Sequence, residues 1–189
     1  SNECEAIALA TGYHLATGKI GVVYMQNSGE GKTVNPLVSL CDPEVYSIPL
    51  IMLIGWRGEP GKKDEPQHVK MGKMTLPLLN TLNIEYEILP DDIGRIASVI
   101  HHMKTIAQKE KKPVAIIIKK GSFSKYESST QTDIQYEMNR EEAIKTIVDN
   151  LKGDEIIIST TGKTSRELFE YRVDRNEQTR DFYTVGSMG

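Results

Sequence analysis

Three polar residues follow the first apolar run of the chain, and their types suit ligand binding. They are Gln26, Asn27 and Ser28, and a Gly-Lys-Thr sequence at 31–33 comes soon after them. A phosphate-binding P-loop needs Gly-x-x-x-x-Gly-Lys-Ser/Thr, which would place its first glycine at position 26. Because Gln26 stands there, the stretch does not match a P-loop. This mismatch argues against the alternative of a nucleotide-binding protein.

A strand, a polar turn and a helix are what this stretch does predict. Ser28 has the side chain of a helix cap, and a helical pattern covers 30–40. Open α/β sheets bind their ligands where strands end and such turns begin. We therefore expect a ligand site here, although the stretch alone does not name the ligand.

A second polar segment, 57–68, follows the buried run 50–55 and is rich in Gly, Pro and charged residues. It is typical of a loop over an active-site mouth. Arg57 offers a planar fork that matches carboxylate or phosphonate oxygens. Asp64 and His68 are candidates for moving protons, and a solvated loop is the alternative.

A third candidate segment follows the last apolar run. Thr161, Gly162, Thr164 and Ser165 form a small polar turn at the start of a helical pattern. Hydroxyl and backbone donors at a helix N-terminus suit phosphate oxygens. An ordinary strand-to-helix connection explains such a turn equally well.

Composition limits the class of protein. The chain has 189 residues, a net charge of −3, 39% hydrophobic residues and two cysteines. The small negative net charge does not indicate binding to nucleic acid. No apolar run reaches the roughly 20 residues of a membrane span. Two cysteines without metal-ligand spacing point to a reducing compartment, so we expect a cytoplasmic protein.

The elements that position these residues alternate between strands and helices. The apolar runs are 20–25, 50–55, 84–89, 114–119 and 155–159, and the helical patterns are 3–17, 30–40, 92–111, 139–150 and 164–170. Strands this uniformly apolar are buried on both faces, which predicts an α/β fold with a parallel sheet and helices on both faces. The polar residues 120–138 separate a domain at 1–119 from a second one, begun at 139–189. We expect both ends of the sequence to be truncated.

Several motifs together carry a family resemblance. They are Asn2-Glu3 with Gly12-Tyr13, Gln26-Asn27-Ser28-Gly29 with Asn35-Pro36-Leu37, Trp56-Arg57-Gly58-Glu59-Pro60-Gly61, and Asp64-Glu65-Pro66-Gln67-His68. In order and spacing the chain resembles the phosphonopyruvate decarboxylases, a family of thiamine-diphosphate-dependent decarboxylases. The resemblance implies the thiamine-diphosphate-binding fold. It makes 1–119 a nearly complete pyrimidine-binding domain lacking its N-terminal part, and 139–189 the start of a truncated diphosphate-binding domain.

The resemblance assigns roles within the first domain. Glu3 is implied as the catalytic carboxylate that bonds a pyrimidine nitrogen of the cofactor and assists loss of the thiazolium C2 proton. The alternative is a first-turn acid that complements the helix dipole. Asn27, Ser28, Asp64 and His68 are implied as further catalytic residues. Gln26 and Arg57 are implied to bind the substrate.

The resemblance also assigns the cofactor contacts of the second domain. They are Thr161, Gly162, Thr164 and Ser165 at the diphosphate, and Gly186, Ser187 and Met188 at the aminopyrimidine. In this family Mg²⁺ is bound by the carboxylate of a Gly-Asp-Gly motif and by the amide oxygen of a later Asn, because hard cations prefer oxygen ligands. The sequence Gly153-Asp154-Glu155 does not match, so we expect no metal ligand in this chain and the metal motif beyond Gly189.

The implied activity is decarboxylation of 3-phosphonopyruvate to phosphonoacetaldehyde and CO2, in phosphonate biosynthesis, by a homo-oligomer with sites between subunits. This truncated chain alone is expected to be inactive. There are two alternatives. One is a decarboxylase of sulfopyruvate or another 2-oxo acid, and the other is a non-catalytic fragment that keeps only subunit contacts. Cys4, Glu30, Lys32 and Thr33 depart from the family pattern near the candidate site.

Overall fold

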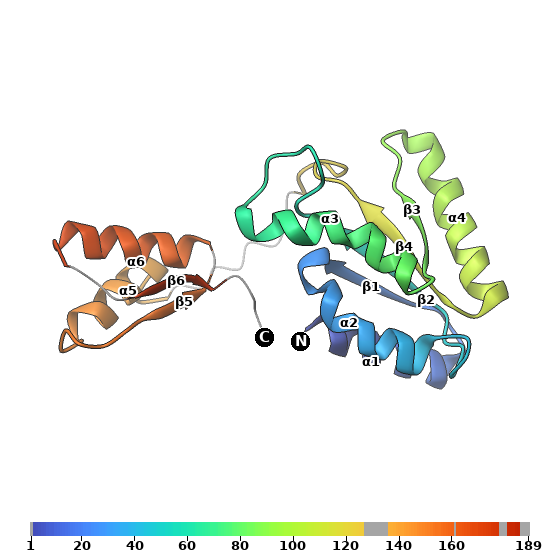
Figure 1. Ribbon diagram of the computed structural model, residues 1–189, viewed down its shortest axis with the longest axis horizontal. Helices are drawn as coiled ribbons and strands as arrows, with labels where there is room; N and C mark the ends of the chain where they lie inside the picture. Colours follow the sequence, from blue (N-terminus) through green and yellow to red (C-terminus); the bar gives the residue numbers. More distant parts are fainter. Residues whose placement is uncertain (1, 127–135, 161, 178–180, 186–189) are drawn as a thin grey trace. The chain divides into compact units, whose positions relative to one another are not determined.

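The computed structural model describes residues 2–126, 136–160, 162–177 and 181–185. The chain divides into two compact units, Ser1–Lys125 and Tyr126–Gly189 (Figure 1). This division lies within the predicted linker 120–138. Among the described residues, no helix is both long and apolar enough to cross a bilayer.

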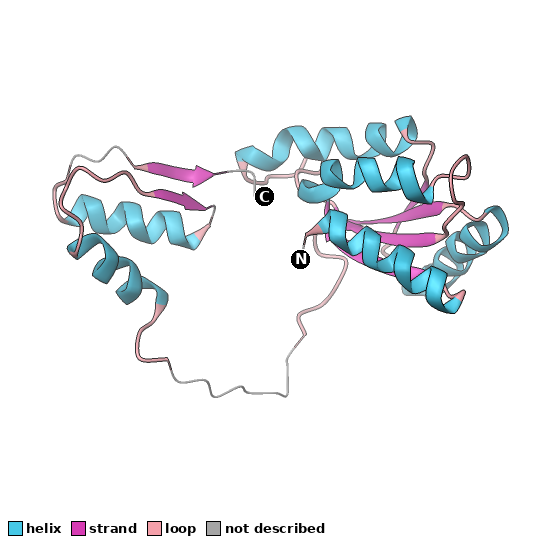
Figure 2. Cartoon of the chain, turned by 90° about the horizontal axis from the view of Figure 1, so that it is seen from below, coloured by secondary structure: helices cyan, strands magenta, loops and turns pink. Residues whose placement is uncertain are grey.

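Helices and strands alternate along both units, as Figure 2 shows by colour. The first unit contains α1 (Glu3–Thr17), β1 (Gly21–Gln26), the 3-10 turn η1 (Asn27–Gly29), α2 (Glu30–Pro36), the π-helical turn η2 (Leu37–Cys41), β2 (Leu50–Gly55), α3 (Pro66–Thr81), β3 (Glu85–Ile88), α4 (Ile93–Glu110) and β4 (Pro113–Ile118). The second contains α5 (Arg140–Asp149), β5 (Ile158–Thr160), α6 (Lys163–Asp174) and β6 (Phe182–Val185). The predicted α/β class is confirmed.

The sheet of the first unit is parallel throughout, with strand order β1-β2-β4-β3. Gln26 at the end of β1 is paired with Gly55 of β2, which is paired in turn with Ile118 of β4. These strands therefore end at one edge of the sheet. The polar segments that follow β1 and β2 are brought together by this register.

The core has two layers, one on each face of the sheet. On one face, Met52 and Ile54 of β2 pack with Ile7 of α1 and Leu79 of α3. On the other face, β4 residues including Ile116 pack with Met103, Ile106 and Ala107 of α4. Because alternate residues of one strand point to opposite faces, uniformly apolar strands need helices on both sides. The predicted coverage of both faces is confirmed.

Helix α3 was not predicted, and this corrects the interpretation of 57–68 as entirely loop. The helix begins at Pro66, so His68 lies in its first turn and not in a loop. Proline is tolerated there because the first N–H groups of a helix have no intrahelical partner. Gly72 and Pro77 lie within the helix and hide its pattern, since both residue types are poor helix formers.

The start of α3 packs closely on the segment after β2. A Cβ at Gly72 would lie 1.8 Å from the carbonyl oxygen of Gly58, and a Cβ at Gly58, whose φ is +68°, would lie 2.1 Å from the carbonyl oxygen of His68. The Trp56 indole Nε1 also donates to the carbonyl of Gly72, at 2.8 Å. Two glycines and one indole thus fix this segment against the helix.

Replacing Gly72 by Ala should lower the free energy of unfolding of the first unit by about 2 kcal/mol, because backbone must move to admit the methyl group. Denaturant unfolding of the wild type and the variant measures this. Gly12→Ala in α1 is the matched control, since a Cβ there meets nothing within 4 Å, and we expect it to be neutral or stabilising. Equal stability of wild type and Gly72→Ala would contradict the close packing.

The second unit holds a parallel pair, β5 and β6, with α5 and α6. β6 was not predicted, and β5 is shorter than the predicted run 155–159. Arg172 is buried and pairs with Asp181, at 3.0 Å, and with Glu177. Tyr183 of β6 packs edge-on against Phe169 of α6. These contacts join the helix to the strand pair.

Candidate active site

Glu3 packs against the turn that follows β1. It is the first residue of α1, and a Cβ on Gly29 would lie 1.9 Å from its carboxyl carbon and 2.2 Å from Oε1. A side chain at position 29 would displace the Glu3 carboxylate from this contact. Glu5 has a different role, because its carboxylate accepts from the backbone N–H of Asn2 at 3.2 Å and completes a capping box. The structure therefore brings Glu3, and not Glu5, to the turn.

Asn27 joins the turns that follow β1 and β2. Its side chain is fully buried. Its Oδ1 accepts from the backbone N–H of Arg57 at 2.9 Å, and its Nδ2 donates to the carbonyl of Arg57 at 2.8 Å and to Oγ1 of Thr75 at 2.9 Å. In this arrangement Asn27 positions the Arg57 backbone, while its predicted catalytic role stays a prediction.

Gln26 and Ser28 flank Asn27 and are exposed. The Ser28 hydroxyl donates to Oε1 of Gln26 at 3.1 Å. The prediction that Ser28 caps α2 is wrong, because the N-cap is Gly29 and no side chain makes a capping bond there. The reason is local, since η1 winds the chain into a 3-10 turn ahead of the helix. Both polar side chains are thereby left at the surface, next to Gly29 in the chain.

Asp64 holds the side chain of Arg57. Its two oxygens accept from Nε and Nη2 of Arg57 at 2.9 and 2.6 Å. It also accepts from the backbone N–H groups of Gly58 and Glu65, at 2.7 and 2.8 Å. The Arg57 guanidinium, with these backbone donors, holds the pKa of Asp64 well below its usual range. Asp64 stays ionised, and this argues for an orienting role and against proton transfer by this carboxyl.

His68 is the third member of this cluster. Its Nδ1 lies 3.1 Å from Oδ1 of Asp64, and its side chain is 15% exposed. A neutral ring that donates from Nδ1 to the ionised Asp64 keeps Nε2 as an acceptor. The sequence placed Arg57, Asp64 and His68 in one segment, and the structure brings their polar atoms together. Proton transfer by His68 stays a prediction.

Glu30 is a site residue that the sequence interpretation recorded only as a departure from the family pattern. It is 2% exposed, and neither carboxyl oxygen has a hydrogen-bond partner among the described residues. Burial raises the pKa of Glu30 to about 7, with a weaker opposing effect of the Thr75 hydroxyl. Its departure from the family pattern was the signal in the sequence.

The cofactor contacts predicted in the second unit are only partly described. Gly162 precedes α6 with φ +97°, which favours glycine. Ser165 is buried, and its hydroxyl bonds Oγ of Ser159 at 2.8 Å, accepts from the N–H of Thr184 at 3.0 Å and donates to the carbonyl of Thr160. Its hydrogen bonds are therefore used within the unit. Thr164 is half-buried. Thr161, Gly186, Ser187 and Met188 lie outside the described residues.

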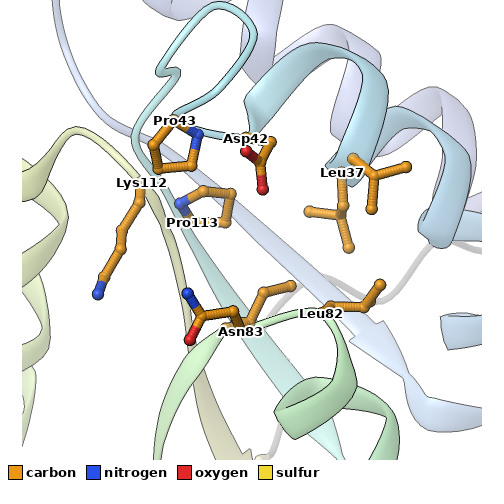
Figure 3. Close-up of a pocket in the computed structure, with 9 residues that line it drawn as sticks. Leu37, Asp42, Pro43, Leu82, Asn83, Lys112 and Pro113 are labelled. Carbon is orange, nitrogen blue, oxygen red and sulfur yellow. The ribbon is translucent and has the colours of Figure 1, made fainter.

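A small cavity lies at the opposite edge of the sheet, where Pro113 begins β4 (Figure 3). Asp42 and Lys112 are the charged residues that line it. Its volume of about 30 Å³ is roughly the room that one water molecule needs, so a cofactor does not fit. Within the described residues there is also no group of three His, Cys, Asp or Glu side chains placed to hold a metal ion.

Comparison with known proteins places this geometry in a family. Residues 1–76 match the N-terminal TPP binding domain of thiamine pyrophosphate enzymes, a range that contains Glu3, Asn27, Arg57 and His68. Sulfopyruvate decarboxylase subunit alpha from Methanothermobacter thermautotrophicus is 35% identical over 118 residues, which are 62% of this chain and 68% of that protein. The chain belongs to the thiamine-diphosphate-dependent decarboxylase family. The predicted family and fold are confirmed.

Two further members of this decarboxylase family match the whole chain. Phosphonopyruvate decarboxylase from Streptomyces viridochromogenes is 33% identical over all of this chain and 50% of its own length. The protein of the same name from Streptomyces hygroscopicus is 32% identical, over all of this chain and 49% of its own length. The chain therefore spans about half the length of these curated relatives.

Proposed function

We propose that the full-length protein decarboxylates 3-phosphonopyruvate to phosphonoacetaldehyde and CO2 with thiamine diphosphate. The observation that carries this is the carboxylate of Glu3 packed on Gly29, at the edge where Arg57 also lies. The names of the two full-chain relatives support the substrate. Incubating the full-length protein with thiamine diphosphate, Mg²⁺ and the 2-oxo acid, and measuring aldehyde and CO2, tests the proposal.

The residues present suit the cofactor. Glu3 is half-buried, and the glycine beside its carboxylate leaves backbone without a side chain at the contact. When bound, thiamine diphosphate supplies the electron sink that lets the carboxylate of a 2-oxo acid leave as CO2. Glu3 would hold a proton at a pyrimidine nitrogen, and Nε2 of His68 would accept or return a proton at the substrate.

Arg57 would bind the anionic end of the substrate. Two of its N–H groups are bonded to Asp64, and an arginine has five. The Arg57 side chain is 37% exposed, so the remaining N–H groups lie within reach of a ligand. A phosphonate carries more negative charge near neutral pH than a sulfonate, which is why we favour phosphonopyruvate over sulfopyruvate. Gln26 and Ser28 would contribute polar contacts from the neighbouring turn.

Arg57→Lys should lower kcat/KM for phosphonopyruvate about tenfold, because the charge is kept but the planar fork and its bonds to Asp64 are lost. Pyruvate, which lacks the phosphonate, should lose less. Steady-state kinetics of both substrates with the full-length protein measures this. An equal loss on both would mean that Arg57 binds the shared carboxylate or only shapes the segment, and faster turnover of sulfopyruvate than of phosphonopyruvate would overturn the substrate.

The similarity to a sulfopyruvate decarboxylase subunit is the observation that favours a second substrate. The rest of the proposal follows the family pattern. It comprises a homo-oligomer, Mg²⁺ bound by residues beyond Gly189, a cytoplasmic location, a pyrimidine-binding domain at 1–119 and the start of a diphosphate-binding domain at 139–189. Chain mass in solution and activity after metal removal test the oligomer and the metal.

A further inference from the structure

A second, larger hollow lies at the edge of the first sheet where the strands begin, opposite to the candidate active site. Its lining comes from three segments: 13–20 at the end of α1, 46–49 ahead of β2, and 104–111 at the end of α4. Because β1, β2 and β4 begin at this edge in parallel register, the segments that precede them meet there. The volume of the hollow is about 830 Å³, which lies within the range of small-molecule sites.

Positive side chains surround this hollow. Lys19 follows α1, Lys104 lies on α4, and Lys111 caps the end of that helix. No Asp or Glu is among the lining residues, and within the described part of the chain none of these three lysines makes an ion pair. The whole chain has a net charge of −3. The hollow is therefore a positive site on an acidic protein.

The dipoles of the neighbouring helices do not account for this charge. The C-terminal ends of α1 and α4 lie at the hollow, and each acts as about −0.5 elementary charge. Together they offset about one of the three lysines, which leaves roughly two positive charges. The neighbouring Lys112, in contrast, has Glu85 and Glu110 at 3.1 and 2.6 Å from its Nζ. The lysines of the hollow lack such partners, so their charge is left for a ligand.

The backbone at Lys111 is unusual for a lysine. This residue is the C-cap of α4 with φ +49°, in the left-handed region, where glycine is usual because a side chain crowds the backbone. Gly18 fills the same position at the end of α1, with φ +68°. A cation at a position that stability alone would give to glycine points to a role for its ammonium group.

Aromatic rings form another part of the lining. The side chain of Tyr13 is 46% exposed and that of Tyr46 is 68% exposed, so both rings have free surface. Such rings can stack on a flat ring of a ligand. His14 also lines the hollow, and with Nδ1 donating to the carbonyl of Lys19 at 3.0 Å its Nε2 stays free. The lining suits a ligand that carries both negative charge and an aromatic ring.

We propose that this hollow binds a nucleoside di- or triphosphate, with its phosphate groups at the three lysines and its base against a tyrosine ring. Lysine binds phosphate as a point charge, so no glycine-rich loop is needed. The P-loop mismatch found in the sequence concerns residues 26–33, which follow β1 at the other edge of the sheet. This binding site is separate from the proposed decarboxylation and goes beyond it.

Titration of the 189-residue chain with ATP, pyrophosphate and adenosine, without added metal, tests the proposal. Calorimetry should show the tightest binding for ATP, weaker binding for pyrophosphate, which has the charge without the ring, and the weakest for adenosine. In NMR spectra, the backbone amides of Lys19, Ser47 and Lys111 should shift with ATP, while the amide of Arg57 should not. The position of the shifts separates this hollow from the candidate active site.

Substitutions with a matched control assign the contacts. Lys104→Gln and Lys111→Gln should each weaken ATP binding about fivefold, the upper value for an exposed charge pair. Lys109→Gln removes the same charge from the same helix but does not line the hollow, so its affinity should stay within about twofold of the wild type. Replacing Tyr13 and Tyr46 together by Ala should reduce the affinity for ATP to that for pyrophosphate.

Three results would overturn the inference. One is a loss in Lys109→Gln equal to that in Lys104→Gln and Lys111→Gln, because ATP would then respond only to the net charge of the chain. Another is equal affinity of the wild type for ATP and pyrophosphate, which would exclude the nucleoside. The third is a set of ATP-induced shifts that includes Arg57 and omits the amides around the hollow.

Discussion

Replacing Glu3 by Gln in the full-length protein should slow exchange of the C2 proton of bound thiamine diphosphate by about 10²- to 10⁴-fold, the usual worth of general acid–base assistance. Glutamine keeps the shape of the side chain that packs on Gly29 but cannot hold and return a proton. Diphosphate anchoring should be nearly unchanged, because it is assigned to other residues. Hydrogen–deuterium exchange followed by NMR measures the C2 rate directly.

Glu5→Gln is the matched control for this experiment. Glu5 lies on the same first turn of α1, but its carboxylate is used in the capping box with Asn2. Glutamine can still accept from the Asn2 N–H, so this change should cost less than about 0.5 kcal/mol of stability and leave the exchange rate close to that of the wild type. Wild-type exchange in Glu3→Gln, or an equal slowing in both variants, would defeat the assignment of Glu3.

Raising the pH from 4.5 to 8.5 should destabilise the first unit by about 3 kcal/mol through Glu30 alone. The pKa of Glu30 is raised by burial from 4.5 to about 7 in the folded protein. The folded state therefore binds the proton more tightly than the unfolded state does. The stabilisation is complete below pH 4.5 and is lost as the pH rises through about 7.

Denaturant unfolding of the wild type and of Glu30→Gln across this pH range measures the effect. The variant has no carboxyl at this position, so its stability should lack this decline. Asp64 does not interfere, because the pKa of this carboxyl is lowered in the folded state and its contribution is lost only at lower pH. The same decline in both proteins would mean that Glu30 is not the group responsible.

Much of the fold was predictable because burial on two faces leaves a plain signal. The run that became β2 has apolar residues at successive positions, and Met52 and Ile51 lie in opposite core layers. Helix α3 was not predictable in the same way. Its breakers, Gly72 and Pro77, contradict local propensity, and its packing on Gly58 is a backbone contact that leaves no periodic pattern in the sequence.

From the sequence, only those neighbours in the candidate site that follow from where the strands end could be predicted. Because parallel strands end at one edge, the residues after β1 and β2 had to be neighbours, and Asn27 does bond Arg57. The pairing of Arg57 with Asp64 and the burial of Glu30 depend on side-chain directions in turns, which carry no periodic pattern. Such contacts become visible only in three dimensions.

The anchoring of the segment after β2 has a consequence for the kinetics of ligand association. The backbone N–H of Trp56 donates to the carbonyl of Ile118 at 2.8 Å, its indole bonds Gly72, and Gly58 meets the helix directly. Arg57 therefore sits on a surface of the first unit that is formed before the ligand arrives. Anion binding should then show a single kinetic phase, with an association rate that falls as salt screens the guanidinium.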